Sequence, residues 1–130
     1  EGSRGLGDVY KRQLLMTATA AGLQVMDHDG TWIDVEGNHE QIIVDSGDMI
    51  QNLTNGLFKS TTHRVVNPGD PTQRRFSMPM FVHPRNEIDL TPLPEFIEQT
   101  SGSADYPSIS AGDYLHQRLA EIGLASTDES

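Results

Sequence analysis

The segment from position 63 to position 77 carries three side chains that could do chemistry together: His63, Arg75 and Ser77. Arg75 and Ser77 are two residues apart, so on a β-strand their side chains share a face. A guanidinium and a hydroxyl on one face suit a carboxylate, because Arg offers a two-pronged donor and Ser adds another. A neutral imidazole such as that of His63 is a ligand for iron, zinc or copper. Spacing alone leaves open both a metal-plus-carboxylate site and a packed histidine near an anion-binding pair.

The other four histidines have simpler explanations. His28 lies in an expected hairpin turn, His39 in a polar loop, His83 before a proline and His116 on the flank of an expected helix. We interpret each as a solvated or packing residue. The chain has no cysteine, which excludes a disulfide framework, a thiolate zinc site and a cysteine nucleophile. Histidine, aspartate and glutamate therefore remain as the strong metal ligands.

Charge is unevenly distributed along the chain. The net charge is -10, from 19 acidic and 9 basic residues, which argues against a protein that coats nucleic acid. Five basic residues nevertheless fall between positions 59 and 85 beside the single acid Asp70: Lys59, Arg64, Arg74, Arg75 and Arg85. This basic segment is either a chance cluster on a solvated surface or part of a pocket for a small anion.

Length and hydropathy indicate a small protein of the cytoplasm. A chain of 130 residues has the size of one domain. It contains no apolar run of the roughly 20 residues that a membrane-spanning helix needs, and its start does not resemble a secretion signal. We therefore expect a soluble, cytoplasmic protein without membrane or nucleic-acid partners.

Short apolar runs separated by turn residues predict a mainly β architecture that positions these side chains. Strands are expected at 23–26, 31–35, 41–45, 61–66 and 75–82, with chain reversals at Asp29-Gly30 and Asn55-Gly56. In the last of these strands, alternation places Arg75, Ser77, Pro79 and Phe81 on one face and Phe76, Met78, Met80 and Val82 on the other.

Helical patterns are expected in two places. Residues 47–54 form a helical turn with Met49, Ile50 and Leu53 directed inward. Residues 113–122 form a C-terminal helix outside the β core, with Ser110 or Asp113 as its cap and Gly123 at its end. An extended connector at 91–94 and a Gly/Ser-rich loop at 99–110 precede that helix. Asn52-Leu53-Thr54 matches a glycosylation acceptor, which carries little weight without a secretion signal.

Two longer motifs resemble a known family. They are the run Gly47-Asp48-Met49-Ile50-Gln51-Asn52-Leu53-Thr54-Asn55-Gly56 with Ser60-Thr61-Thr62-His63-Arg64-Val65-Val66-Asn67, and the element Arg75-Phe76-Ser77-Met78-Pro79. The upstream Gly22-Leu23-Gln24-Val25, Asp29-Gly30 and Trp32 also fit. Together they are similar to the C-terminal half of the isopenicillin N synthase-like group of non-haem iron, 2-oxoglutarate-dependent oxygenases.

The resemblance implies the C-terminal part of a double-stranded β-helix, or jelly roll, that holds Fe(II) on two histidines and one carboxylate. His63 would be the second histidine ligand, while Arg75 and Ser77 would hold the far carboxylate of the cosubstrate 2-oxoglutarate. That cosubstrate is oxidised to succinate and CO2 as O2 oxidises a small organic substrate. The resemblance also implies that His63 and Arg75 lie on opposite sheets and face each other across the roll.

The sequence departs from the family before position 14. Residues 1–13 resemble a translated sequencing-adapter tract, so we expect a foreign or unstructured leader there, a partial oxygenase domain at 14–84 and a C-terminal extension at 85–130. The family's His-x-Asp ligands would fall at Leu6 and Asp8, and leucine cannot bind iron. We therefore expect this chain to be a fragment that is inactive alone.

Two other functions are compatible with the same residues. One is an isopenicillin N synthase-like oxidase, in which Arg75 and Ser77 hold the carboxylate of the substrate and no 2-oxoglutarate is used. The other is a non-catalytic jelly-roll module that binds an anion, with His63 as a core residue. The sequence does not identify the substrate or the oligomeric state.

Overall fold

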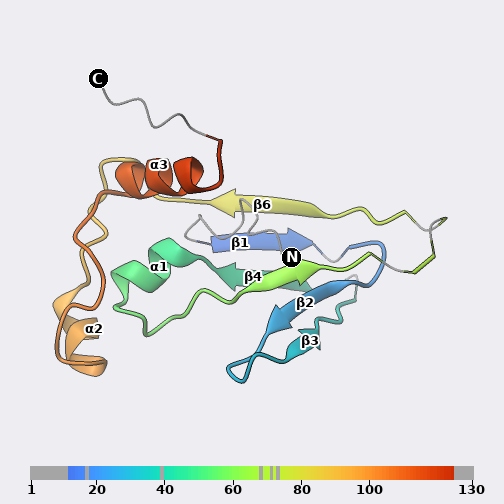
Figure 1. The fold of residues 1–130 in the computed structure, drawn as a ribbon, viewed down its shortest axis with the longest axis horizontal. Helices are drawn as coiled ribbons and strands as arrows, with labels where there is room; N and C mark the ends of the chain where they lie inside the picture. Colours follow the sequence, from blue (N-terminus) through green and yellow to red (C-terminus); the bar gives the residue numbers. More distant parts are fainter. Residues whose placement is uncertain are drawn as a thin grey trace.

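Two three-stranded antiparallel sheets and three helices make up the computed structural model, which describes residues 12–16, 18–38, 40–67, 69–70, 72 and 74–124 (Figure 1). One sheet has the order β4-β1-β6 and the other has the order β3-β2-β5. The elements are β1 (Arg12–Met16), β2 (Leu23–Met26), β3 (Trp32–Asp34), β4 (Ile42–Ser46), α1 (Asp48–Leu53), β5 (His63–Val65), β6 (Met78–Val82), α2 (Pro94–Gln99) and α3 (Ala111–Glu121).

In the β4-β1-β6 sheet, alternation separates an inner face from an exposed one. Leu15 of β1 lies opposite Ile43 of β4 and Pro79 of β6, and all three line one cavity. The neighbouring positions carry large apolar side chains that are exposed: Met16, Ile42, Val44, Met78, Met80 and Val82; of these, Val44 also borders the cavity. Of the residues expected on one face of 75–82, Arg75, Ser77 and Pro79 line this cavity, whereas Phe81 is exposed and does not.

The β3-β2-β5 sheet begins with the expected hairpin. The backbone N–H of Asp27 donates to the carbonyl of Thr31 at 2.8 Å, which closes the turn between β2 and β3. On the outer face, the Arg64 guanidinium lies 4.0 Å from the centre of the Trp32 ring. Arg64 Nε also donates to Gln24 at 2.8 Å, so stacking and hydrogen bonding together tie β5 to its neighbours. Because neighbouring residues of a strand face opposite ways, this attachment leaves His63 on the inner face.

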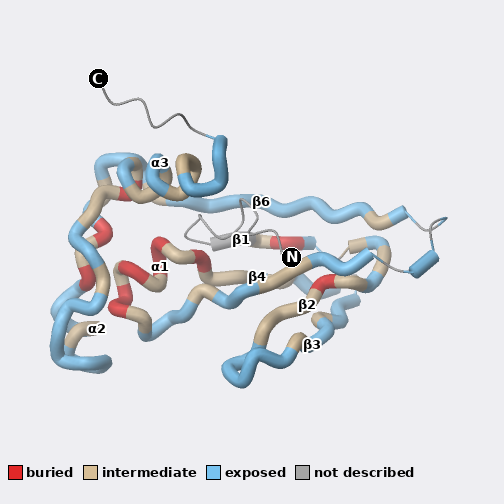
Figure 2. Tube along the Cα trace, viewed as in Figure 1, coloured by how far each residue is buried: buried red, intermediate tan, exposed pale blue. Residues whose placement is uncertain are grey.

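Buried apolar residues gather where α1 meets the C-terminal segment, as Figure 2 shows. The cluster consists of Met49 from α1, Leu90 from the segment before α2, and Ala111 from α3, and each is at most 2% exposed. Arg118 of α3 donates to the Asp48 carboxylate at 2.6 Å across the same contact. The C-terminal helix therefore packs on α1, beside the sheets.

Two buried asparagines fasten the C-terminal segment to α1. Asn52 Nδ2 donates to the carbonyl of Leu90 at 2.7 Å and to that of Pro107 at 3.0 Å. Asn55, which has a left-handed φ of 50°, donates to Thr100 and accepts from the backbone of Asp105. Asn52 is 1% exposed, so the acceptor motif that begins there is not accessible for glycosylation in the folded chain.

We expect Asn52→Ala to lower the free energy of unfolding by about 2–4 kcal/mol, because two carbonyls lose their donor in a buried setting. Urea unfolding followed by circular dichroism measures this effect. Gln117→Ala, on the exposed side of α3, is the control and is expected to change stability by less than about 0.5 kcal/mol. Equal stability of the two variants would contradict the fastening role of Asn52.

Several boundaries differ from those expected. β5 (His63–Val65) and β6 (Met78–Val82) are shorter than the strands expected at 61–66 and 75–82, so Arg75 and Ser77 precede β6. β1 begins at Arg12, so the domain boundary expected at Leu14 falls inside a strand; residues 1–11 lie outside the described part of the chain. α2 occupies Pro94–Gln99, where a connector and the start of a loop were expected; Pro94 is at its first turn, where proline's missing N–H costs no helical hydrogen bond. α3 begins at Ala111, two residues early, because Ser110 caps it by accepting from the Asp113 N–H.

Candidate functional site

A cavity of about 310 Å³ between the two sheets brings together the three residues expected to do chemistry. His63 reaches it from β5, and Arg75 and Ser77 reach it from the segment that leads into β6. His63 lies on β5 as expected, whereas Arg75 precedes β6 and belongs to no strand, so the expectation that it sits on a strand of the opposite sheet is wrong; the two side chains nevertheless line the same cavity. The remaining lining residues are mostly apolar: Leu15, Leu23, Val25, Ile43, Val44, Asp45, Thr61, Val65 and Pro79.

Arg75 and Ser77 form the anion-binding side of this cavity. Arg75 Nη1 donates to Ser77 Oγ at 3.4 Å, so the two side chains are oriented toward the same point. Arg75 Nε is buried and has no hydrogen-bond partner among the described residues. A buried N–H donor without a partner is costly, and a bound carboxylate oxygen would satisfy it. The pair therefore fits the carboxylate of 2-oxoglutarate.

The Nδ1 atom of His63 has two polar neighbours. It lies 3.2 Å from the backbone carbonyl oxygen of Thr61, which can only accept a hydrogen bond, and Asp45 Oδ2 of the opposite sheet lies 3.8 Å from the same nitrogen. The two side chains are similarly buried, with 21% of His63 and 20% of Asp45 exposed. A proton on Nδ1 leaves the lone pair on Nε2, which is the form of imidazole that binds a metal ion. His63 therefore fits as one ligand of an iron ion.

A second cavity of about 540 Å³ adjoins the first, and Arg75 lines both. Gly22, directly before β2, lines this second cavity and has a φ of +123°. A Cβ at Gly22 would stand 2.3 Å from the carbonyl oxygen of Val66 and 3.9 Å from Arg75 Nε. Glycine is thus required for the close approach of the two strands directly beside the guanidinium.

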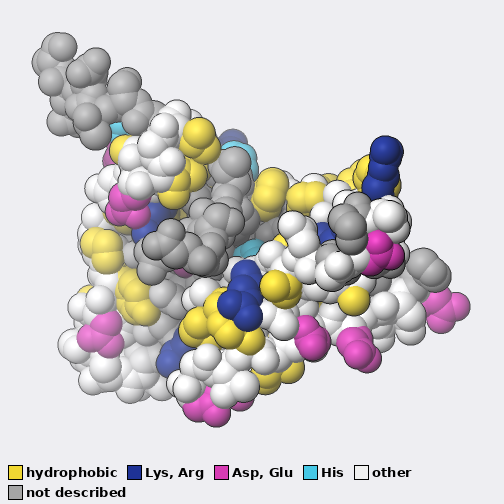
Figure 3. Space-filling model, turned by 45° about the vertical axis from the view of Figure 1, so that its right-hand side comes forward, with side chains coloured by type: hydrophobic (Ala, Val, Ile, Leu, Met, Phe, Trp, Pro, Cys, Tyr) yellow, Lys and Arg dark blue, Asp and Glu magenta, His cyan; other side chains and the backbone are white. Residues whose placement is uncertain are grey.

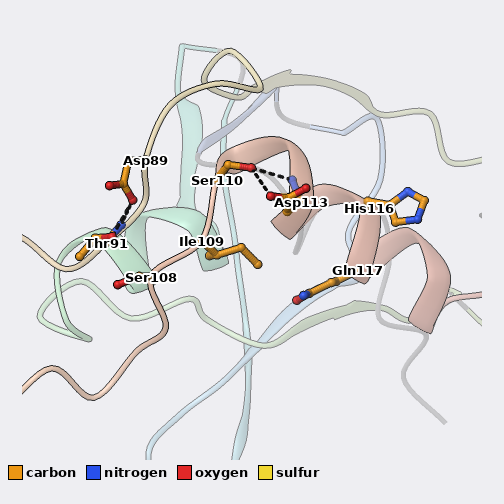
Figure 4. A pocket seen from close by; sticks show the side chains of 8 residues that line it. All are labelled: Asp89, Thr91, Ser108, Ile109, Ser110, Asp113, His116 and Gln117. Carbon is orange, nitrogen blue, oxygen red and sulfur yellow. Dashed lines mark hydrogen bonds between the residues drawn. The ribbon is translucent and has the colours of Figure 1, made fainter. Parts of the chain in front are cut away.

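A further cavity, of about 580 Å³, lies beside the N-terminus of α3 and contains none of the expected site residues (Figure 4). Asp89 accepts from the Thr91 hydroxyl and backbone, and these hydrogen bonds hold the pKa of Asp89 below its usual value. Asp113 likewise accepts from Ser110 within the helix cap. These polar groups therefore stabilise a loop and a helix end, and we assign no chemistry to this cavity.

The basic segment of the sequence does not form one surface patch on the face drawn in Figure 3, where Lys and Arg side chains stand at separate places. Arg64 lies on the Trp32 ring, while Lys59, Arg74 and Arg85 are exposed. Of the five basic residues, Arg75 lines the cavity between the sheets. One oriented guanidinium, rather than the net charge of the segment, is the basis of the anion site.

No three His, Asp or Glu side chains of the described residues lie where they could jointly hold a metal ion. Leu6 and Asp8, which stand at the family's His-x-Asp positions, lie outside the described residues. Within the same described part of the chain, no helix is long and apolar enough to cross a membrane.

Residues 12–84, which include both sheets and every lining residue of the cavity between them, match the family model of the 2OG-Fe(II) oxygenase superfamily. The chain belongs to this superfamily. Curated relatives include 1-aminocyclopropane-1-carboxylate oxidase 1 of Malus domestica, which is 38% identical over 96 residues, or 73% of this chain and 30% of the relative. Feruloyl CoA ortho-hydroxylase F6H1-2 of Ipomoea batatas is 36% identical over 124 residues, or 93% of this chain and 34% of the relative.

Solved structures of the superfamily have the same fold. A putative 2OG-Fe(II) oxygenase family protein from Caulobacter crescentus has a TM-score of 0.79 and 35% identity, with 88% of this chain and 38% of that chain covered. A full-length Neurospora crassa protein in complex with alpha-KG has a TM-score of 0.76 and 33% identity, with 88% and 35% covered. The two sheets are therefore part of an oxygenase jelly roll. The chain spans about a third of the length of these relatives.

The structure adds two residues beside the candidate site that the sequence did not single out. Asp45 faces the cavity from β4; a lone acid after the β-branched run 42–44, two positions from the inward Ile43, is the pattern that could have indicated it. Gly22 stood within a recognised motif, but no local pattern reveals that Val66 and Arg75 approach it.

Proposed function

We propose that this protein is an Fe(II)- and 2-oxoglutarate-dependent oxygenase that oxidises a small organic substrate with O2 and releases succinate and CO2. His63 is an iron ligand, and Arg75 and Ser77 bind the far carboxylate of 2-oxoglutarate. The observation that carries the proposal is the cavity that joins His63 to Arg75, whose buried Nε has no partner among the described residues. Membership of the superfamily supports the same activity.

In this proposal, one side of the cavity binds the cosubstrate and the other side binds the iron ion. Arg75 and Ser77 fix one end of the cosubstrate, so its 2-oxo end extends away from them toward the region of His63. Leu15, Leu23, Val25 and Ile43 form an apolar lining that excludes water. The absence of water strengthens the ionic contact between Arg75 and the carboxylate. Iron, when bound, supplies the reaction with O2.

The test is iron-dependent CO2 release from 2-oxoglutarate, measured on this chain and on a version extended upstream from the complete reading frame. We expect release by the extended version, at least a ~100-fold loss in its His63→Ala variant, and none by the 130-residue chain, because leucine at position 6 provides no ligand. His28→Ala, in an exposed turn, is the control.

Two results would overturn the proposal. One is an extended version that takes up iron but does not decarboxylate 2-oxoglutarate. The other is full activity in the His63→Ala variant. Iron-dependent succinate formation by the 130-residue chain would instead overturn the expectation that it is inactive alone.

The second candidate is an oxidase that uses no 2-oxoglutarate. Its support is the 38% identity to an enzyme named as an oxidase of 1-aminocyclopropane-1-carboxylate, whose named substrate carries a carboxylate. In that case Arg75 and Ser77 would hold the substrate's own carboxylate. O2 consumption in the presence of substrate but without 2-oxoglutarate distinguishes the two.

We also propose a cytoplasmic location and no nucleic-acid partner. The net charge of -10 supports the latter, because a protein that coats nucleic acid needs a basic face. Fluorescence microscopy of the tagged chain and a nucleic-acid gel-shift assay measure these two properties.

A further inference from the structure

Asp45 stands beside the proposed iron ligand, two residues before the motif that begins at Gly47. It extends from β4 of one sheet toward His63 on β5 of the other, and its Oδ2 is buried 3.8 Å from His63 Nδ1. This separation is longer than a hydrogen bond, so the carboxylate acts on the imidazole chiefly through its charge. The contact spans the cavity and joins the two sheets at the proposed metal ligand.

The position of this charge favours one form of the histidine. A negative carboxylate near Nδ1 stabilises a proton on that nitrogen, and the Thr61 carbonyl at 3.2 Å accepts the same N–H. The lone pair is then on Nε2. Metal-bound histidines generally donate their other N–H to a carboxylate or a backbone carbonyl, which orients the ring and makes the ligand more basic.

We propose that Asp45 is a positioning residue that sets the tautomer and orientation of His63 for metal binding. This inference rests on the proposed function, in which His63 binds iron. Asp45 is not itself a ligand in this scheme; it acts through the imidazole. Its β-strand neighbours confine its side chain to the inner face, where the opposite sheet brings His63 within reach.

The first test uses the 130-residue chain without metal. Long-range ¹H–¹⁵N NMR spectra at about pH 9, where histidine side chains are neutral, report which ring nitrogen of His63 carries the proton. We expect Nδ1–H to dominate in the unaltered chain and its ratio to Nε2–H to fall about 5-fold or more in Asp45→Ala. Asp45→Asn keeps an acceptor oxygen and is expected to retain part of the preference. Asp34→Asn, an acid-to-amide change on β3, is the control and should have no effect.

The second test measures the affinity of the same chain for Co²⁺ alone by NMR titration, in a double-mutant cycle with His63→Ala. Asp45→Ala is expected to weaken binding about 10-fold when His63 is present and to have no effect when it is absent. An unchanged tautomer ratio in Asp45→Ala overturns the inference. Loss of Co²⁺ affinity in the His63→Ala background overturns it too, because Asp45 would then be a ligand. A changed ratio with unchanged Co²⁺ affinity supports positioning by Asp45 but counts against His63 as a metal ligand, and hence against the proposed function.

Discussion

Replacing Arg75 with glutamine is expected to weaken the binding of 2-oxoglutarate about 100-fold, because a charged, two-pronged donor to a carboxylate is lost inside a largely apolar cavity. Ser77→Ala is expected to cost about 5-fold, the value of one neutral hydrogen bond. NMR titration of the 130-residue chain with 2-oxoglutarate measures both effects, including affinities in the millimolar range.

Arg74→Gln is a matched control for the Arg75 variant. It removes the same charge one position earlier in the chain, from a side chain that is exposed and does not line the cavity. We expect its affinity for 2-oxoglutarate to stay within about 2-fold of the unaltered chain, since exposed charges are screened by salt. Equal weakening by the two variants would show that general charge, rather than the oriented guanidinium, attracts the anion.

Replacing Gly22 with alanine is expected to destabilise the fold by about 3 kcal/mol or more, because two penalties add at this position. The φ of +123° is unfavourable for a residue with a side chain, and the new Cβ would stand 2.3 Å from the Val66 carbonyl oxygen. Relief of that contact requires β2 and β5 to separate beside Arg75. We therefore also expect weaker binding of 2-oxoglutarate in any folded fraction of this variant.

Gly30→Ala separates the two penalties. Gly30 has a φ of +85°, but a Cβ at this position would meet nothing within 4 Å, so the residue carries the conformational cost without the collision. We expect a loss of about 1–2 kcal/mol there. Urea unfolding followed by Trp32 fluorescence measures both variants. If Gly22→Ala is no less stable than Gly30→Ala, the close approach to Val66 is not a constraint on the fold.

Local patterns predicted most elements because each depends on residues near in sequence. The Asp29-Gly30 turn between apolar runs predicted the β2–β3 hairpin, and alternation in 75–82 predicted that Arg75, Ser77 and Pro79 face the cavity. α2 was missed because its six residues are too few for a helical period, and Pro94 was interpreted as a sign of extended chain. The inward Met49 and Ile50 were correct, but the partners of Met49 from positions 88–115 could not be identified from spacing.

The sequence by itself determined the family and the side chains that are candidates for its site. The motifs at 47–67 and 75–79 indicated the oxygenase jelly roll, and with it His63, Arg75 and Ser77 as candidate site residues. It could do so because motifs preserve residue types at fixed spacing along the chain.

Only the tertiary structure decided which other groups surround them. Asp45 of β4 and His63 of β5 are separated in sequence by α1 and lie on different sheets, yet Asp45 Oδ2 is 3.8 Å from His63 Nδ1. Gly22 lies beside Arg75, and the buried Arg75 Nε lacks a partner in the described part of the protein. These relations arise when two sheets close over one cavity, and a distance across a cavity depends on the packing of both sheets rather than on the spacing along either strand.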